Sequence, residues 1–151
     1  MEMECCLFDR PHHARIAKLL ESLDATLLAR HQCLFGGGTA IALKFGEYRE
    51  SRDVDFLVSS VDAYRETRAV VTAQGIAGLF TRPVKALREA RMDQYGIRAM
   101  LEVGGEPIKL EIVLEGRIVL DAPAPGDVIC GVRTLTTPDL VSEKLLANSD
   151  R

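Results

Sequence analysis

The sequence has no tryptophan, and aromatic residues make up only 5% of its 151 residues. Proteins that bind single-stranded nucleic acid without sequence preference stack bases on aromatic side chains, so this composition argues against a stacking platform. The formal net charge of −3 also argues against general coating by nucleic acid, although a local basic patch is compatible with it. Neither a signal peptide nor an apolar run long enough to cross a membrane is found. These absences predict a cytoplasmic protein.

Recognisable metal-binding cysteine motifs are also absent. The four cysteines form no Cys-x-x-Cys pair and no Cys/His spacing typical of zinc. Cys33 and Cys130 lie in apolar runs and are predicted to be small buried side chains, whereas Cys5 and Cys6 are interpreted as free surface thiols. The three histidines have no ligand partners at metal-site spacing and are predicted to lie on the surface. They are His12, His13 and His31.

The most informative segment spans residues 34–58. Three consecutive glycines, Gly36, Gly37 and Gly38, stand near its start. They follow a short apolar run that is expected to be a strand, and residues 39–45 space their apolar side chains as a helix does. Glycines in this position allow positive φ and a close approach to a ligand, and the free N–H groups of the next helix favour an anion such as phosphate.

A polar turn over residues 47–52 leads to a second predicted strand, which opens with Asp53 and Asp55. Two residues apart on an extended chain, these carboxylates project from the same face. Two carboxylates suit a hard cation such as Mg²⁺, particularly when a nucleotide supplies further oxygens. The glycines are not those of a P-loop, because no Gly-Lys-Ser/Thr follows them, and position 41 is not the third glycine of a dinucleotide fingerprint.

Together, the run from Gly37 to Asp55 resembles the signature of the nucleotidyltransferase superfamily that includes DNA polymerase beta. Within that superfamily it is most similar to the AbiEii toxin family of type IV toxin–antitoxin systems. The resemblance is strong over residues 34–58 and looser over residues 95–151. It implies transfer of a nucleoside monophosphate from an NTP to an acceptor hydroxyl, with release of pyrophosphate. It further implies tRNA or another RNA as the acceptor, and an antitoxin as a partner.

The resemblance also implies a catalytic set that binds Mg²⁺ or Mn²⁺, formed by Asp53, Asp55 and Glu111. Glu111 lies in the second strand of a predicted hairpin, residues 97–103 and 108–114, which turns at Gly104 and Gly105. The alternative for Glu111 is a surface side chain paired with Lys109. If Glu111 is not the third acid, Glu115 is the next candidate, and Glu102 is less favoured.

Eight residues are predicted to bind the nucleotide: Gly36, Gly37, Gly38, Thr39, Arg49, Ser51, Arg52 and Lys144. Gly37, Gly38 and Thr39 would hold the β- and γ-phosphates. The two arginines would contact the triphosphate or form a structural ion pair, and Ser51 would tie the turn together. Lys144 would lie near the triphosphate, or else be a surface lysine.

The predicted fold is α+β, a mixed twisted sheet with helices mainly on one side. A flexible N-terminus over residues 1–10 would precede a nucleotidyltransferase domain over residues 11–151, which ends at the start of a helical region (134–151) without the usual complete C-terminal helical domain. Helices are predicted over residues 12–30, from a cap at Asp62 to Gln74, and after a cap at Thr137. Short strands are expected over residues 75–80 and 116–120, and a loop over 121–131.

Residues 81–91 are ambiguous between helix and strand. A helix there would align Lys85, Arg88 and Arg91 on one face, as a solvated surface or a contact for polynucleotide phosphate.

Three other functions are compatible with the sequence. A nucleotidyltransferase acting on a small cationic antibiotic would use a similar site, and the acidic balance slightly favours it over a polynucleotide acceptor. An antitoxin-type nucleotidyltransferase would modify a partner protein, but such enzymes usually show Gly-Ser in place of Gly-Gly-Thr. A non-catalytic nucleotide-binding module is the third. The sequence does not determine the NTP or the oligomeric state.

Overall fold

The computed structural model describes residues 8–117 and 119–149. The helices are α1 (Pro11–Ser22), α2 (Ala25–Arg30), α3 (Gly37–Lys44), α4 (Val61–Gln74), the 3-10 helix η1 (Ile76–Leu79) and α5 (Thr137–Ser149). The strands are β1 (Leu34–Gly36), β2 (Val54–Val58), β3 (Lys85–Ala86), β4 (Arg91–Met92), β5 (Gly96–Val103), β6 (Glu106–Leu114), β7 (Val128–Ile129) and β8 (Val132–Arg133). Cys5 and Cys6 lie outside the described residues.

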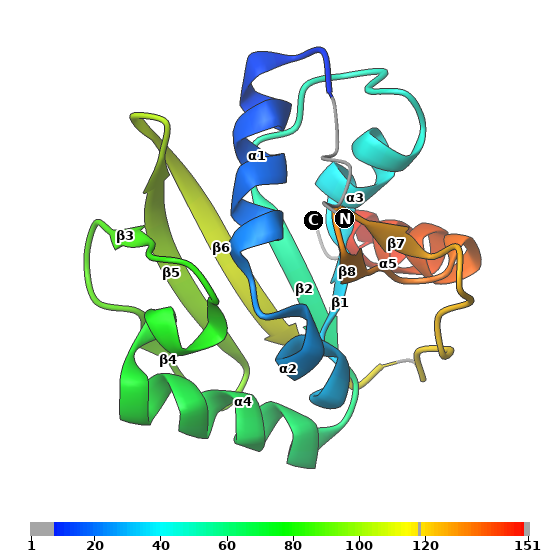
Figure 1. The fold of residues 1–151 in the computed structure, drawn as a ribbon. Coiled ribbons are helices and arrows are strands. Elements are labelled where there is room, and N and C mark those ends of the chain that lie inside the picture. Colours follow the sequence, from blue (N-terminus) through cyan, green and yellow to red (C-terminus); the bar gives the residue numbers. More distant parts are fainter. Residues whose placement is uncertain (1–7, 118, 150–151) are drawn as a thin grey trace.

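In the described part of the chain, six strands form one mixed sheet in the order β1-β2-β6-β5-β3, with β4 also paired to β5 (Figure 1). β2 and β6 are parallel, and the pairings of β1 with β2 and of β5 with β6 are antiparallel. The predicted hairpin is confirmed as β5 and β6, and the turn uses positive φ at Gly104 and Gly105. The predicted α+β class is therefore confirmed.

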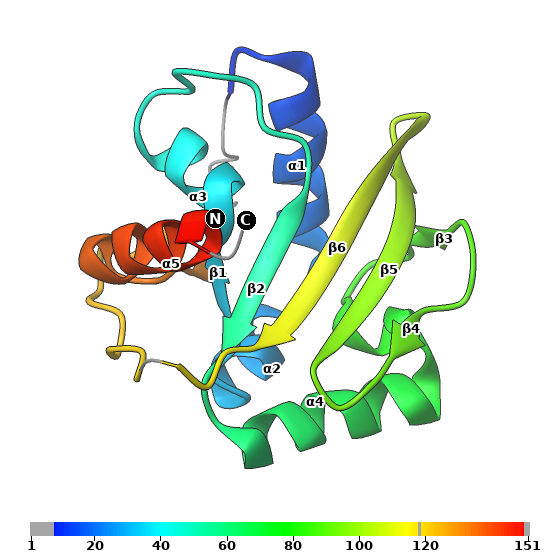
Figure 2. The same ribbon diagram turned by 180° about the vertical axis from the view of Figure 1, so that it is seen from behind.

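One face of the sheet is apolar and forms the core. Alternate residues of β2 and β6, such as Phe56 and Leu110, are buried there against α1 and α4, which contribute Leu20 and Tyr64. Figure 1 shows α1 lying across this face. The opposite face carries Glu111 and its neighbours, and no helix of the described residues crosses it over β5 and β6 (Figure 2). The helices α3 and α5 lie beside the β1 edge (Figure 2).

The single helix predicted over residues 12–30 is wrong, because the chain forms two helices there. Leu23 is extended and makes an isolated bridge with Phe80, and the Asp24 side chain accepts a hydrogen bond from the Leu27 N–H as the cap of α2. The apolar spacing continues through the break because both helices pack on the same core. Periodicity alone therefore does not reveal the break.

Several predicted boundaries also need correction. Residues 76–79 form η1 instead of a strand, and the described residues at 116, 117, 119 and 120 form no strand, while residue 118 lies outside the description. The predicted loop over 121–131 includes β7, and residues 81–91 contain β3 and β4 rather than a helix.

The predicted helix caps are each displaced. α4 is capped by Ser60, whose hydroxyl accepts from the Ala63 N–H, while Asp62 sits in the first turn. At the start of α5, the Thr136 hydroxyl accepts from the Asp139 N–H, so Thr136 takes the role predicted for Thr137.

Among the described residues, no helix combines the length and apolar character that a membrane crossing requires.

Candidate active site

The two strands that carry the predicted acids lie next to each other. Asp53 directly precedes β2, Asp55 is within β2, and Asp55 is in register with Glu111 on the parallel neighbour β6. Residues in register on neighbouring strands are about 5 Å apart and project from the same face. The fold therefore brings together an acid pair and a third acid that is 56 residues further along the chain.

The ionisation of Asp55 reflects this crowding of acids. The pKa of Asp55 is raised to about 6, first by burial and then by the negative charges of Glu111 and Asp53, while the positive charge of Lys109 opposes the shift. A cation bound here would relieve that repulsion, and oxygen donors are the ligands that Mg²⁺ or Mn²⁺ prefers. The donor set therefore fits a hard divalent cation.

Glu111 is also engaged by cations of the protein itself. Its carboxylate is 2.8 Å from Arg98 Nε on β5 and 3.9 Å from Lys109 Nζ. The alternative pairing of Glu111 with Lys109 is thus present as the longer of two contacts. Within the described ranges, no group of three or more His, Cys, Asp or Glu side chains is gathered closely enough to enclose a metal. Glu111 is instead ion-paired with Arg98.

The glycine turn lies directly against Asp55. A Cβ atom built on Gly37 would be 2.7 Å from Asp55 Oδ2, and Gly37 has a φ of +76°. Any larger residue would therefore clash with the carboxylate and adopt a strained backbone. Gly37 and Gly38 begin α3, so the free N–H groups of its first turn lie beside the carboxylate. Gly36 differs, because a Cβ there would meet the side chains of Leu57 and Leu135, which indicates a packing role.

Two cationic side chains reach the same turn from different elements. A Cβ built on Gly38 would be 2.5 Å from Arg49 Nη2 and 3.9 Å from Lys144 Nζ. Arg49 comes from the loop between α3 and β2, and Lys144 comes from α5. Arg52 pairs with Glu50, and its side chain is 58% exposed. The glycine turn is thus lined by one carboxylate and two cations.

Thr39 and Ser51 form an internal hydrogen-bonded group beneath the turn. The Thr39 hydroxyl is 2.6 Å from the Ser51 hydroxyl and donates to the backbone carbonyl of Asp53. Thr39 is buried, so its hydroxyl braces α3 against the start of β2. The expectation that Ser51 ties the turn together agrees with these contacts.

The histidine prediction is wrong: His12, His13 and His31 are all buried, with at most 6% of any of them exposed. His12 Nε2 lies 3.0 Å from the Arg52 carbonyl, His13 contacts Glu47 and Ser51, and His31 Nδ1 lies 3.0 Å from the Thr67 hydroxyl. Their partners are polar groups of distant segments. Because sequence spacing does not reveal such partners, no local signal could have identified them.

The buried Cys33 was predicted correctly, and its burial raises the thiol pKa to about 11.

The other acids considered for the site lie elsewhere. Glu115 follows the end of β6, is buried and is held by Arg117 at 2.8 Å. Glu115 also contacts Glu143 of α5, and Glu143 Oε2 is buried and has no hydrogen-bond partner among the described residues. Glu102 lies on β5 and pairs with Lys85 at 3.5 Å. Neither Glu115 nor Glu102 is in register with Asp55, and Glu111 is.

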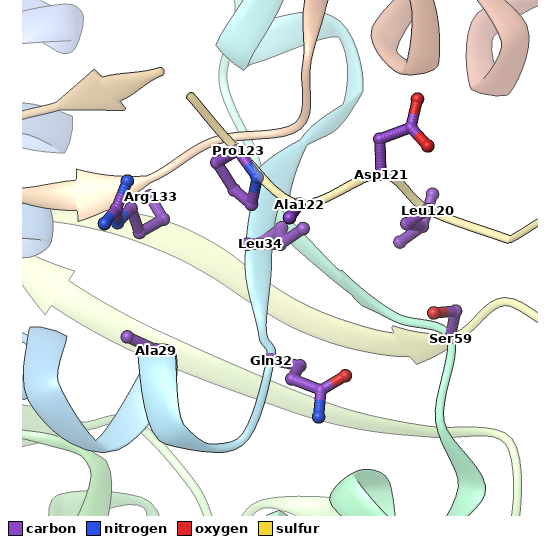
Figure 3. A pocket seen from close by; sticks show the side chains of 9 residues that line it. All are labelled: Ala29, Gln32, Leu34, Ser59, Leu120, Asp121, Ala122, Pro123 and Arg133. Atoms are coloured by element: carbon purple, nitrogen blue, oxygen red, sulfur yellow. The ribbon is translucent and has the colours of Figure 1, made fainter. Parts of the chain in front are cut away.

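A pocket of about 390 Å³ lies away from these acids and is lined by residues that include Leu34, Ser59, Asp121 and Arg133 (Figure 3). Leu34 is in register with Leu57, near the opposite end of β2 from Asp53. This pocket therefore lies at the other end of β2 from the candidate site.

The fold is that of nucleotidyltransferases. It matches JHP933 from Helicobacter pylori with a TM-score of 0.53 and 18% identity, over 92% of this chain and 58% of that one. A second H. pylori structure, provisionally described as a nucleotidyltransferase, matches with a TM-score of 0.52 and 21% identity, over 89% of this chain and 56% of that one. This chain therefore spans little more than half the length of either structure.

Residues 18–151 match the family model described as "Nucleotidyl transferase AbiEii toxin, Type IV TA system". The chain belongs to this AbiEii family, as the glycine and Asp-x-Asp motifs indicated. Comparison with curated proteins gives no match.

Proposed function

We propose that this protein transfers a nucleoside monophosphate from an NTP to an acceptor hydroxyl and releases pyrophosphate. The observation that carries the proposal is the contact of the Gly37–Gly38 turn with Asp55, between the cations of Arg49 and Lys144. An anion bound at the first turn of α3 would meet backbone N–H groups and two positive side chains. A neighbouring carboxylate pair is the complement that a metal–triphosphate complex requires.

The proposed cofactor is Mg²⁺ or Mn²⁺, held by Asp53 and Asp55, with Glu111 as the third acid. When bound, such an ion lowers the pKa of an attacking hydroxyl and neutralises charge on the leaving pyrophosphate. Arg98, 2.8 Å from Glu111, holds this carboxylate on the open face of the sheet. From that position Glu111 can accept the proton of an approaching acceptor hydroxyl.

The protein's own side chains supply the remaining functions. Arg49 and Lys144 orient the triphosphate over Gly38, and Thr39 fixes the first turn of α3 to the backbone of Asp53. The effect is to align the α-phosphate with the acceptor, which is how phosphoryl-transfer enzymes gain most of their rate. Arg52 is assigned a structural ion pair with Glu50 instead of a phosphate contact.

RNA is the proposed acceptor, with tRNA as the first candidate. The face of β5 and β6 beside the acids is open and carries Arg98 and Lys109, and the adjoining strand β4 places Arg91 in register with Arg98. A row of cations beside the acids suits a polyanionic acceptor better than a cationic drug. The description of the family as a type IV toxin supports a toxin role with an antitoxin as the partner.

The test is a transfer assay with each α-³²P-labelled NTP, Mg²⁺ or Mn²⁺, and either total tRNA or an aminoglycoside. Label is expected to enter tRNA with wild-type protein and to be lost with Asp53→Asn. Asp62→Asn, which changes an exposed acid in α4, is the matched control and should retain transfer. Labelled aminoglycoside would replace the proposed RNA acceptor with a small molecule. Tight NTP binding without any labelled product would instead indicate a non-catalytic module.

A further inference from the structure

His13 is completely buried, and both of its ring nitrogens are hydrogen-bonded. The backbone N–H of Ser51 donates to His13 Nε2 at 2.9 Å. Since Nε2 accepts this bond, the ring proton of the neutral imidazole sits on Nδ1. Nδ1 then donates to the Glu47 carboxylate, 2.9 Å away. The local geometry thus selects a single tautomer.

Glu47 forms the other side of this arrangement. Its carboxylate accepts from the backbone N–H groups of Asp9 at 2.8 Å and Arg10 at 3.0 Å, and Arg10 Nε donates to its carbonyl at 3.1 Å. Burial opposes ionisation of Glu47, but these hydrogen bonds and His13 outweigh it and lower its pKa. Glu47 also has a φ of +57°, a conformation rare for a residue other than glycine. The residue is therefore held ionised and in a conformation that the surrounding contacts must maintain.

The bonds continue from His13 to the candidate site. The backbone N–H of Ser51 donates to His13, and the Ser51 hydroxyl is hydrogen-bonded to the Thr39 hydroxyl. The Thr39 hydroxyl in turn donates to the backbone carbonyl of Asp53. Glu47 and Ser51 also delimit the short segment that contains Arg49, the side chain placed over Gly38. The His13 ring is therefore bonded to both ends of the segment 47–51, which contains Arg49. Through Ser51 and Thr39 this segment is connected to the backbone of Asp53.

We infer that His13 is a positioning residue for nucleotidyl transfer: as an Nδ1-protonated imidazole it fixes residues 47–51, and so holds Arg49 over the glycine turn. This inference rests on the proposed function. The hydrogen bonds of the His13 ring go to Ser51 and Glu47 and not to Asp53, Asp55 or Glu111, so His13 acts on the candidate site indirectly. It also lies before residue 18, where the match to the family model begins. His13, on α1, therefore lies outside the matched region, whereas its partners Glu47 and Ser51 lie within it.

Two substitutions of His13 each keep one of the two hydrogen bonds of the ring and remove the other. The amide oxygen of glutamine reaches about the position of Nε2 and can accept from Ser51, whereas the amide nitrogen of asparagine lies near Nδ1 and can only reach Glu47. His13→Gln should keep the NTP KM within about 3-fold of wild type, and His13→Asn should raise it about 10-fold or more with a smaller change in kcat. Amide exchange of Ser51 in the free protein should accelerate about 10-fold in His13→Asn alone.

His31→Asn is the matched control, because His31 is also buried and bonded to a hydroxyl but lies away from this segment, against Thr67 of α4. It should change thermal stability without moving the NTP KM or Ser51 exchange. Wild-type KM and wild-type Ser51 exchange in His13→Asn would overturn the inference. If that variant does not fold, His13→Gln decides alone, because a 10-fold rise in its KM or exchange is incompatible with the Ser51 acceptor as the important contact. Absence of transfer by wild-type protein would instead overturn the proposed function, while Ser51 exchange still tests the contact of His13 with Ser51.

Discussion

At the scale of single residues, the candidate site depends on what is missing from two positions. Gly37 and Gly38 have no Cβ atoms, and this leaves room for Asp55 on one side and for Arg49 and Lys144 on the other. Backbone N–H groups and charged side chains can then meet at one point. The two glycines are required for different reasons. Gly37 has a positive φ, which other residues rarely adopt, whereas the φ of Gly38 is not positive.

Gly38→Ala isolates the contribution of this space. The added methyl would displace the flexible end of Arg49, so nucleotide affinity should fall about 10-fold while stability changes by less than about 1 kcal/mol. Isothermal titration with a non-hydrolysable NTP and thermal melting measure the two effects. Gly116→Ala is the control, because a Cβ there meets no atom within 4 Å. Unchanged affinity in Gly38→Ala would remove Arg49 from the nucleotide site.

At the scale of elements, α5 joins the site to the far end of the parallel strands. Lys144 points to the glycine turn, while the preceding Glu143 is buried beside Glu115 at the end of β6. The pKa of Glu143 is raised to about 7, first by burial and then by the charge of Glu115. A protonated Glu143 next to an ionised Glu115, itself held by Arg117, is the arrangement that avoids two buried charges of the same sign.

This pair predicts a pH-dependent stability. The folded protein retains a proton on Glu143 that the unfolded chain releases near pH 4.5, so its contribution to stability is lost as the pH rises from about 4.5 through about 7. Glu143→Gln keeps a neutral side chain and should therefore be more stable than wild type by about 1–2 kcal/mol at pH 8. The difference should disappear near pH 4.5.

Urea unfolding at the two pH values measures this difference. Glu89→Gln changes an exposed acid and should show no pH-dependent difference from wild type. An equal effect of Glu143→Gln at both pH values would mean that Glu143 does not titrate in this range.

At the scale of the whole molecule, one packed face of the sheet supports one open, charged face. Phe35 on β1 and Phe56 on β2 are buried with ring centroids 5.6 Å apart, and they connect the strand before the glycines to the strand of the acids. Apolar packing on one face thus fixes the relative position of polar groups on the other. No helix of the described residues covers the other face over β5 and β6 (Figure 2), and this is the face where we propose that the acceptor binds.

Phe56→Ala tests this dependence. Loss of the ring should lower the free energy of unfolding by about 3–5 kcal/mol, measured by urea denaturation. Tyr95→Ala is the control, since Tyr95 is 64% exposed and its removal should change stability by about 0.5 kcal/mol or less. A small effect of Phe56→Ala would show that the β1–β2 connection does not depend on this packing.

The family, the α+β class, the hairpin of β5 and β6, and the position of the glycines beside Asp55 could be predicted from the sequence. These features are local: each depends on residues within one or two elements, so spacing and residue type are sufficient to identify them. The family resemblance implies Glu111 as the third acid, and Glu111 is in register with Asp55 on the parallel strand β6; its role in binding a metal stays a prediction.

The partners of the buried polar groups could not be predicted from the sequence. The three histidines were predicted to lie on the surface because no ligand partner is near them in the sequence. Each is instead buried and hydrogen-bonded to a residue more than 30 positions away. The break between α1 and α2 was hidden for the same reason, since it depends on a bridge from Leu23 to Phe80. Burial of a polar group is favourable only when a distant donor or acceptor meets it, and the folded chain alone brings those two groups together.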